Sequence, residues 1–568
     1  MKEIKSIIAK KLSENIEQLS WREIMGNLEY PPEPDMGDLA LPCFKLSKVL
    51  RKSPVAIADS LVDLLNIDLV ERCESKSGYL NIFLKREYMV NNILKNIVDL
   101  KEEFGKSDEN AGKTVCIDYS APNIAKPFHI GHLRSTVIGH AIRRLHEFRG
   151  YKCIGINHLG DWGTQFGKLI VAYKNWSSKE LIEEKGTEEL VRIYVKFHAE
   201  AENNPSLNDE ARKWFSKLEK KDEEAVELWK WFKDISLLDI EKTYKMLDIS
   251  FDSYAGESFY NDKMEPVIEE LKQKNLLQSS DGAMIVNLEE YNMPPCLILK
   301  SDGSSLYATR DIAAAMYRKK TYDFAKCIYV TATAQDLHFK QLFKVVELMG
   351  YEWAKDLIHV GFGMVSMGGA KLATREGNII YLDDLFKEAS KRVLDIINEK
   401  NPDMEDKEQK AIDIGVGAIV FSDLSNNRIK DIDFSWEDAL NFDGSTGPYV
   451  QYTYARACSV LRKSEIADDE INMNGIEPGH MTNDEEFSLL KTLSLFNEKI
   501  DQALKDLEPS AIARYLIDVC MVFNKFYNSH TILNAQENKK FRILLTSAVK
   551  YVLGNGLQII GLKKTERV

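Results

Sequence analysis

The sequence predicts an α/β protein built around a parallel, doubly wound sheet. Four short segments have the apolar, β-branched composition of buried strands: 115–119, 153–157, 327–331 and 357–362. Helical patterns follow the first two of these segments, at 131–148 and 165–173. Alternation of strands and helices is typical of a parallel sheet covered by helices on both faces. Ligands of such sheets bind beyond the carboxyl ends of the strands, so we expect the functional site there.

The composition narrows the class of protein. The chain has 568 residues, of which 44% are hydrophobic and 29% charged, as in folded proteins of several domains. The net charge of −13 argues against general binding to DNA or RNA. Two regions are nevertheless basic, with six Lys or Arg at 126–152 and eight from 525 to the end. These regions could hold a polyanion at chosen places, or they could be solvated helix faces.

The sequence also predicts where the protein works. Its first residues are amphipathic and charged, unlike a signal peptide, and the longest apolar stretch, 414–421, is too short to cross a bilayer. The eight cysteines occur singly, without the spacing of metal ligands. We therefore expect a cytoplasmic protein with no membrane segment and no dedicated metal site.

Changes of pattern along the chain predict four parts, at 1–105, 106–390, 391–443 and 444–568. The second part contains the predicted strands and is interrupted at about 175–255 by a helical insertion, because 206–250 is densely charged and has no Gly or Pro. The third part is expected to be a helical connector. A break at Gly444–Pro448 precedes the last part, which is predicted to be helical.

Residues 120–135, SAPNIAKPFHIGHLRS, join the first predicted strand to the first helix. A helix N-terminus presents free N–H groups that favour phosphate, and Gly131 would allow the ligand to approach the backbone. His129 and His132 would add two donors there. For an isolated pair, helix capping is the better interpretation, but the position after the first strand of the sheet favours phosphate binding.

This segment, followed by NHLGDWGTQFG at 157–167, resembles the HIGH region of class I aminoacyl-tRNA synthetases in its arginyl form. Three further segments resemble that family in the expected order: SDGSSLYATRDIAAA (301–315), TAQDLH (333–338) and TGPYVQYTYAR (446–456). The resemblance covers essentially the whole chain. It implies a Rossmann-type parallel-sheet catalytic domain with a helical insertion and a C-terminal α-helical anticodon-binding bundle. It also implies an N-terminal α+β domain that touches the outer corner of tRNA, with Gly37-Asp38 in its most recognisable turn.

The resemblance implies that the chain is an arginine–tRNA ligase and, by the family norm, a monomer. L-arginine would attack the α-phosphate of ATP, giving arginyl-adenylate, and a terminal ribose hydroxyl of tRNA(Arg) would then take the arginyl group. Neither step needs a protein nucleophile, so the enzyme must align reactants and stabilise charge on phosphate oxygens. Mg²⁺ accompanies ATP. By resemblance, His129 and His132 hold the phosphates and Gly131 makes room for the adenosine.

A second loop, KMSKS in the family, corresponds to KLATR at 371–375. Lys371, Thr374 and Arg375 are its expected ATP contacts, whereas Leu and Ala replace the Met and Ser of the usual pattern. Family members that lack this lysine have one just before the HIGH motif, and this chain has Lys126 there as well. The catalytic lysine is therefore either Lys126 or Lys371. Its glycine-rich setting alone would make Lys371 a solvated surface residue.

Recognition of arginine requires partners for five fixed donors on a planar cation, and carboxylates satisfy these best. Tyr307 and Asp311 would share one face of a helix. The same spacing is also expected if Asp311 only stabilises the helix dipole and Tyr307 packs in the core. Asp161 could contact the substrate's ammonium or pack in its turn. The resemblance, together with neighbouring acidic residues, makes six side chains the expected arginine site: Asn123, Tyr307, Asp311, Gln335, Asp118 and Glu257.

The helical bundle should bind unpaired anticodon bases, which stack on aromatic rings. The expected contacts are Tyr449, Tyr452, Tyr454, Arg456, Phe523 and Tyr527. Aromatic residues at helical spacing more often belong to the core, so we expect two or three of these to be buried. The chain ends in Glu566-Arg567-Val568 where the family has Glu-Arg-Met, a change that would alter any contact of the last side chain.

Two other functions stay open at this point. A non-catalytic relative that binds tRNA or protein would explain the altered second loop, but not the retained His129, His132 and Asp311. A synthetase for a neutral or anionic amino acid would leave the acidic residues of the pocket uncompensated, which is costly.

Overall fold

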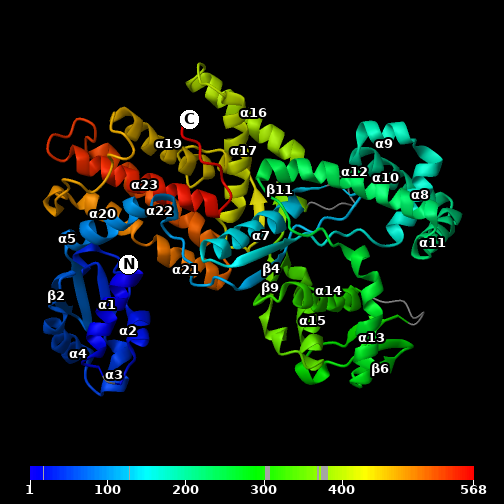
Figure 1. The fold of residues 1–568 in the computed structure, drawn as a ribbon, viewed down its shortest axis with the longest axis horizontal. Coiled ribbons are helices and arrows are strands. Elements are labelled where there is room, and N and C mark those ends of the chain that lie inside the picture. The colour runs from blue at the N-terminus through cyan, green and yellow to red at the C-terminus, as the bar shows by residue number, and fades with distance from the viewer. Residues whose placement is uncertain (17, 127, 301–306, 368–369, 372–380, 568) are drawn as a thin grey trace.

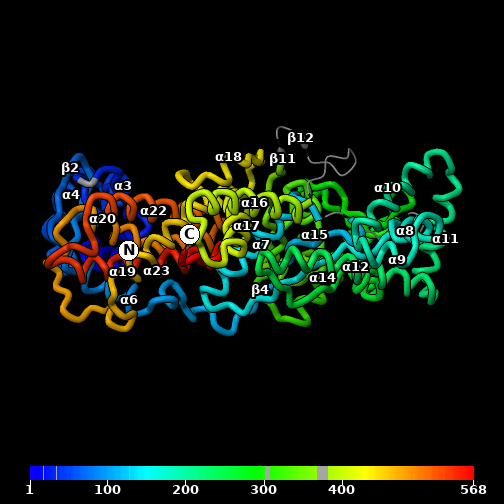
Figure 2. The backbone as a smooth tube through the Cα atoms, turned by 90° about the horizontal axis from the view of Figure 1, so that it is seen from above, coloured from blue at the N-terminus to red at the C-terminus, as the bar shows by residue number. Residues whose placement is uncertain are grey.

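The computed structural model describes residues 1–16, 18–126, 128–300, 307–367, 370–371 and 381–567. The molecule is elongated, with the N-terminal part at one end and a group of helices from 164–247 at the other (Figures 1 and 2). The C-terminal helices lie beside the N-terminal part, and the central sheet lies between them and the 164–247 helices.

Four parallel strands form the central sheet, in the order β10-β9-β4-β5. They are β4 (Thr114–Asp118), β5 (Lys152–Ile156), β9 (Lys326–Ala332) and β10 (Leu357–Phe362). The helices next to them are α7 (Ile130–Phe148), α8 (Thr164–Trp176), α14 (Tyr307–Tyr322) and α15 (Asp336–Leu348). Strands and helices alternate, and the predicted parallel α/β fold is confirmed. The carboxyl ends of β4 and β9 lie side by side, because Asp118 pairs with Tyr329.

The helical insertion follows α8. It consists of α9 (Lys179–Lys185), α10 (Thr187–Asn203), α11 (Ser206–Glu219) and α12 (Glu223–Leu247). These helices share a core of their own, which includes Phe197 and Phe232. The end of α12 returns to the sheet, where the Tyr244 hydroxyl lies 2.7 Å from Ser120 Oγ and accepts from Asn157 Nδ2 at 2.9 Å.

A small antiparallel sheet that the sequence did not predict precedes α14. It contains β6 (Leu277–Ser280), β7 (Ala283–Val286) and β8 (Cys296–Leu299), with α13 (Met264–Gln273) before it in the chain. Its strands are four residues long, and β6 is mostly exposed. Such short strands have too little apolar alternation to be recognised from sequence.

The N-terminal part is an α+β unit, as predicted. A three-stranded antiparallel sheet, β1-β3-β2, packs with helices. Its elements are α1 (Lys2–Ser13), α2 (Trp21–Asn27), β1 (Leu39–Pro42), α3 (Phe44–Leu50), α4 (Pro54–Leu61), β2 (Val70–Lys76) and β3 (Tyr79–Leu84). In the Gly37-Asp38 turn, Gly37 has φ +95°, and a Cβ there would meet Ile82 O at 2.9 Å. Asp38 accepts from Lys491 Nζ at 2.9 Å, so this turn is attached to the C-terminal helices.

α5 (Arg86–Tyr88) and α6 (Lys95–Leu100) connect the N-terminal part to the central sheet. From residue 382 onward, the chain is mainly helical. These helices are α16 (Leu382–Lys400), α17 (Lys407–Leu424), α18 (Trp436–Ala439), α19 (Gly447–Lys463), α20 (Asp484–Leu493), α21 (Phe496–Asp506), α22 (Ser510–Ser529) and α23 (Lys539–Ile559). α19 begins at the predicted break, where the Thr446 side chain caps it by accepting from Tyr449 N. A small sheet joins β12 (Ala370–Lys371), β11 (Val365–Met367) and β13 (Ile432–Phe434).

A buried arginine connects α7 to this second half of the chain. Arg134 is 1% exposed and forms an ion pair with Asp423 of α17 at 3.1 Å. Its guanidinium also donates to three main-chain carbonyls, of Gly363 at 2.7 Å, Lys430 at 2.9 Å and Arg428 at 3.1 Å. One side chain therefore ties the first helix of the sheet to the segments that lead into β11 and β13.

We expect Asp423→Ala to lower the midpoint of thermal unfolding clearly. Removing one member of a buried ion pair leaves the other charge uncompensated and costs about 3–5 kcal/mol. Calorimetry on the full chain would measure the midpoint, with Asp395→Ala on the exposed face of α16 as the control. Equal midpoints for the two variants would show that Arg134 does not need its carboxylate.

Candidate active site

The two histidines of the HIGH segment lie at the N-terminus of α7, beyond the carboxyl end of β4. His129 is the N-cap residue, and its Nδ1 accepts from the Gly131 N–H at 3.0 Å. His132 Nδ1 accepts from the His129 N–H at 3.2 Å. A side chain at Gly131 would meet the His129 ring at 2.8 Å, so only glycine fits beside it. The histidines therefore do cap the helix, but only through Nδ1.

The protonation of these rings follows from their contacts. Since each Nδ1 accepts a hydrogen bond, the neutral ring carries its proton on Nε2. Burial lowers the pKa of His132 to about 3, and burial and the nearby charge of Lys126 lower the pKa of His129. At neutral pH both rings are uncharged, and each can offer an Nε2–H donor. Capping and ligand binding are thus compatible.

The second loop is anchored beside the same histidines. β12 pairs with β11, so the Lys371 backbone lies opposite Ser366. At the other end of the loop, Tyr381 pairs with His129 in an antiparallel bridge, and the Leu382 N–H donates to Phe128 O at 3.0 Å. The Lys371 side chain, Thr374 and Arg375 lie outside the described residues. Lys126 is described, and its charge acts on both histidines.

The residues expected to bind arginine come from three places around the carboxyl ends of β4 and β9. Tyr307 and Asp311 are on the first turns of α14; Tyr307 is 69% exposed and so does not pack in the core. Gln335 is exposed in the turn before α15. Asn123 follows β4 and forms a parallel bridge with Gly160. Asp311 accepts from His338 Nε2 at 2.7 Å.

Three of the acidic candidates are already paired. Asp118 is 7% exposed and binds Arg318 at 2.7 Å, so its charge is compensated inside the protein. Glu257 lies 3.4 Å from Arg310. Asp161 is fully buried and contacts Lys233 Nζ at 2.5 Å and the Ser258 backbone N–H at 2.8 Å. For Asp161 the structure therefore favours the packing interpretation.

Sequence reasoning did not single out four side chains that complete this arrangement: Arg310, Arg318, His158 and His338. Arg310 and His338 stand inside the quoted segments, and Arg318 lies seven residues after Asp311 on the same helix. The spacing of Asp311 and Arg318 along α14 could have suggested a shared face. Nothing in the sequence shows that Arg318 reaches Asp118, which belongs to a strand about 200 residues earlier in the chain.

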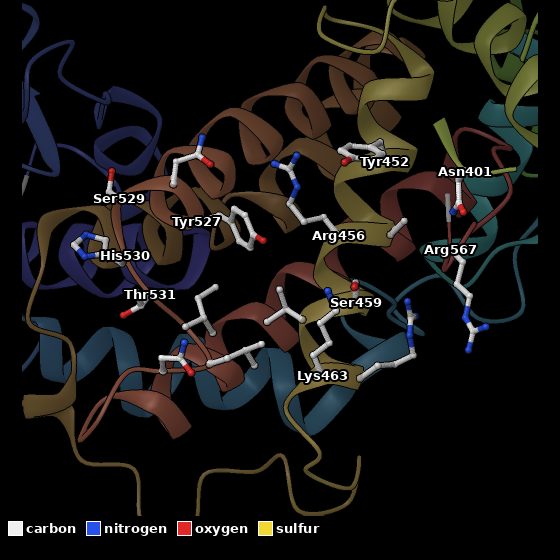
Figure 3. Close-up of a pocket in the computed structure, with 17 residues that line it drawn as sticks. Asn401, Tyr452, Arg456, Ser459, Lys463, Tyr527, Ser529, His530, Thr531 and Arg567 are labelled. Atoms are coloured by element: carbon white, nitrogen blue, oxygen red, sulfur yellow. The ribbon is translucent and has the colours of Figure 1, made fainter. Parts of the chain in front are cut away.

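A second candidate site is a pocket of about 740 Å³ between α19 and α22 (Figure 3). The Arg456 guanidinium lies over two rings, 5.0 Å from the Tyr452 centroid and 5.1 Å from that of Tyr527. No acidic side chain occurs among the pocket's lining residues, all of which the structure describes. The lining contains four cations: Arg456, Arg462, Lys463 and Arg567. This chemistry suits an anion that also carries flat rings.

Two of the expected tRNA contacts need correction. Phe523 is 0% and Tyr454 4% exposed, and both belong to the hydrophobic core. A base cannot stack on a ring whose faces are already covered by apolar side chains. Tyr449 is half-buried, and its hydroxyl accepts from Asn524 Nδ2 at 3.0 Å. As expected, part of the aromatic set is core.

Family models match almost the whole chain. Residues 2–84 match the N-terminal domain of arginyl-tRNA synthetases, 90–436 the catalytic domain of class I tRNA synthetases of the arginine type, and 450–568 the DALR anticodon-binding domain. The chain belongs to the arginyl-tRNA synthetase family. It is accordingly a class I aminoacyl-tRNA ligase.

Sequence and structure comparisons with individual arginyl-tRNA synthetases support this assignment to the family. The chain is 52% identical over 571 residues to the arginine–tRNA ligase of Alkaliphilus metalliredigens (strain QYMF), and 51% identical over 570 residues to that of Clostridioides difficile (strain 630), with all of each chain covered. The arginyl-tRNA synthetase structures from Plasmodium falciparum and Thermus thermophilus superpose with TM-scores of 0.82 and 0.83, at 28% and 25% identity. Both alignments cover 100% of this chain and 99% of the other.

The described residues of this arginyl-tRNA synthetase contain neither a membrane-spanning helix nor a metal-binding cluster. No helix among them is both long and apolar enough to cross a membrane. No group of three or more His, Cys, Asp or Glu side chains among them could hold a metal ion.

We expect Glu257→Gln to change how stability depends on pH. Burial raises the pKa of Glu257 from 4.5 to about 7. Between these values the unfolded chain has lost this proton and the folded chain retains it, so this group's stabilisation is present at low pH and is lost as pH rises. The variant should gain stability over the wild type as pH rises from about 4.5 to about 7, as judged from urea midpoints.

Glu265→Gln, an exposed change on α13, is the matched control. Parallel pH profiles for the wild type and Glu257→Gln would contradict the raised pKa.

Proposed function

We propose that the chain carries out the reaction of its family, arginine–tRNA ligation, with the residues described above. L-arginine and ATP would react to arginyl-adenylate and pyrophosphate, and the arginyl group would pass to the 3′-terminal adenosine of tRNA(Arg). The observation that carries this proposal is the pair of neutral histidines at the start of α7. They lie at the same sheet edge as Asp311, a carboxylate that has no Lys or Arg partner among the described residues.

For ATP, His129 and His132 would direct their Nε2–H groups to phosphate oxygens. Uncharged donors at a helix N-terminus stabilise developing negative charge without first having to be desolvated as ions. Gly131 would leave room for the adenosine. Lys126 or Lys371 would meet the pyrophosphate, and Thr374 and Arg375 would complete the second loop. Mg²⁺ would arrive with ATP as part of the substrate.

For arginine, Asp311 would accept from the guanidinium, with Tyr307 and Gln335 beside it and Asn123 at the substrate's backbone groups. Glu257 is a further candidate, since its partner Arg310 is 3.4 Å away rather than in close contact. Asp118 is a less suitable candidate, because it already binds Arg318 at 2.7 Å.

For tRNA, we propose that the pocket of Arg456, Tyr452 and Tyr527 receives anticodon-loop nucleotides, with Tyr449 at its edge. Cations neutralise phosphates, and aromatic or guanidinium planes stack on bases. We also propose a cytoplasmic monomer. The support for the location is that all eight cysteines, each of them described, are free thiols. Light scattering would measure the oligomeric state.

We expect ATP–pyrophosphate exchange that depends on arginine and, as in the family, occurs only when tRNA is present. The assay would be run with and without tRNA(Arg). The variant Asp311→Asn should raise the KM for arginine at least about tenfold, because a hydrogen bond to a charged group contributes about 1.5–3 kcal/mol. The KM for ATP should change little.

Absence of exchange under both conditions would favour a non-catalytic relative. An equal rise of both KM values in Asp311→Asn would mean that Asp311 has only a structural role.

We expect Tyr527→Ala to raise the KM for tRNA about tenfold, since base stacking contributes about 1–3 kcal/mol. Steady-state aminoacylation would measure this, and the KM for arginine should not change. Phe523→Leu on the same helix is the matched control, because it should lower thermal stability without a selective effect on the KM for tRNA. A selective rise of the KM for tRNA in Phe523→Leu but not in Tyr527→Ala would refute the assignment of the pocket.

A further inference from the structure

The charged side chains around Asp311 form pairs that leave this one carboxylate uncompensated. Arg318 pairs with Asp118 at 2.7 Å, and Arg310 lies 3.4 Å from Glu257. Asp311 has no Lys or Arg partner within 4.0 Å among the described residues; its ion-pair contacts are two histidines. When all are ionised, the two arginines and three carboxylates carry a net formal charge of −1, which one guanidinium would neutralise.

Two histidines lie beside Asp311, one at each carboxylate oxygen, and only His338 is within hydrogen-bond distance. His338 Nε2 donates to Asp311 Oδ2 at 2.7 Å. His158 Nε2 lies 4.0 Å from the other oxygen, Oδ1. His338 is on α15, three residues after Gln335, whereas His158 follows β5. Asp311 is thus hydrogen-bonded by a residue of α15, has the loop after β5 beside it, and is still 27% exposed.

The charge of His158 follows from its third contact. Arg318 Nη2 donates to His158 Nδ1 at 3.3 Å, and since a guanidinium has no acceptor, this nitrogen must carry the lone pair. The ring is then neutral, with its proton on Nε2, which faces Asp311. Burial lowers the pKa of His158 in agreement with this tautomer. His158 therefore lies beside the carboxylate without neutralising it.

We propose that His338 is a positioning residue for Asp311, whose N–H orients the carboxylate while its negative charge stays available to the substrate's guanidinium, and that the neutral ring of His158 lies beside the same carboxylate without competing for its charge. This inference rests on the proposed role of Asp311 in arginine binding. A lysine or arginine at either place would orient the carboxylate equally well but would compete with the substrate for its charge. Arg318 contributes indirectly, because it fixes the tautomer of His158.

The test is a series of substitutions at position 338 that separates hydrogen bonding from charge. His338→Asn retains an uncharged N–H donor, His338→Leu removes it, and His338→Lys adds a permanent positive charge. Dissociation constants for L-arginine and for its neutral isostere citrulline would be measured by calorimetry on the full chain. KM values for arginine and ATP would be measured in aminoacylation. His480→Gln, in the C-terminal part, is the matched control.

We expect arginine binding to weaken less than about threefold in His338→Asn, about tenfold in His338→Leu and about a hundredfold in His338→Lys. The KM for ATP should stay within about twofold throughout, because the substitution acts on one substrate. His338→Lys should also reduce the preference for arginine over citrulline. If His338→Leu fails to fold, as judged by its thermal midpoint, the dissociation constants for arginine of His338→Asn and His338→Lys are compared instead.

Equal arginine binding by His338→Asn and His338→Lys would overturn the inference, as would equal changes in the KM values of arginine and ATP. Asp311→Asn is measured in parallel. If it leaves arginine binding unchanged, the proposed arginine site itself is wrong. If it weakens binding while the substitutions at position 338 have no effect, only the role of His338 is refuted.

Discussion

Arg134 lies five residues after His129 on α7, and its guanidinium is almost completely buried between segments that are about 230 to 300 residues further along the chain. Desolvating a guanidinium is costly unless an opposite charge and hydrogen-bond acceptors surround it. Asp423 and three carbonyls meet this requirement. The carbonyls belong to the segments that lead into β11 and β13, so this buried charge ties β11, the strand that pairs with β12, to the helix that carries the histidines.

The same principle organises the substrate region. Each arginine near the carboxyl ends of the strands has its own carboxylate, and the histidines at the start of α7 are kept neutral by burial and by donors to their Nδ1 atoms. The two arginines described here are thus paired, and the protein presents neutral donors at the proposed ATP site and one carboxylate, Asp311, at the proposed arginine site. Such preorganisation suits a reaction in which alignment and charge stabilisation replace covalent catalysis.

Sequence reasoning was most successful where a pattern is long or a motif has several members. The strands at 114–118 and 326–332 and the helix at 130–148 agree with the predicted segments to within a few residues. It failed for the short strands between 277 and 299, and for Phe523 and Tyr454. Periodicity places an aromatic ring on a helix face but does not say what covers that face, and here other helices of the bundle do. Asp118 likewise looks available in sequence, but a distant arginine binds it.

By itself, the amino-acid sequence determined the α/β class, the family resemblance and the positions of the histidines that we propose bind phosphate. These depend on local composition and on spacing within short segments. Only the tertiary structure decided which charges are already paired: Asp118 with Arg318, Asp161 with Lys233, Arg134 with Asp423, and Asp311, within the described part of the chain, with histidines alone. The physical reason is that an ion pair joins side chains brought together by folding, and the distance between them along the chain can be hundreds of residues.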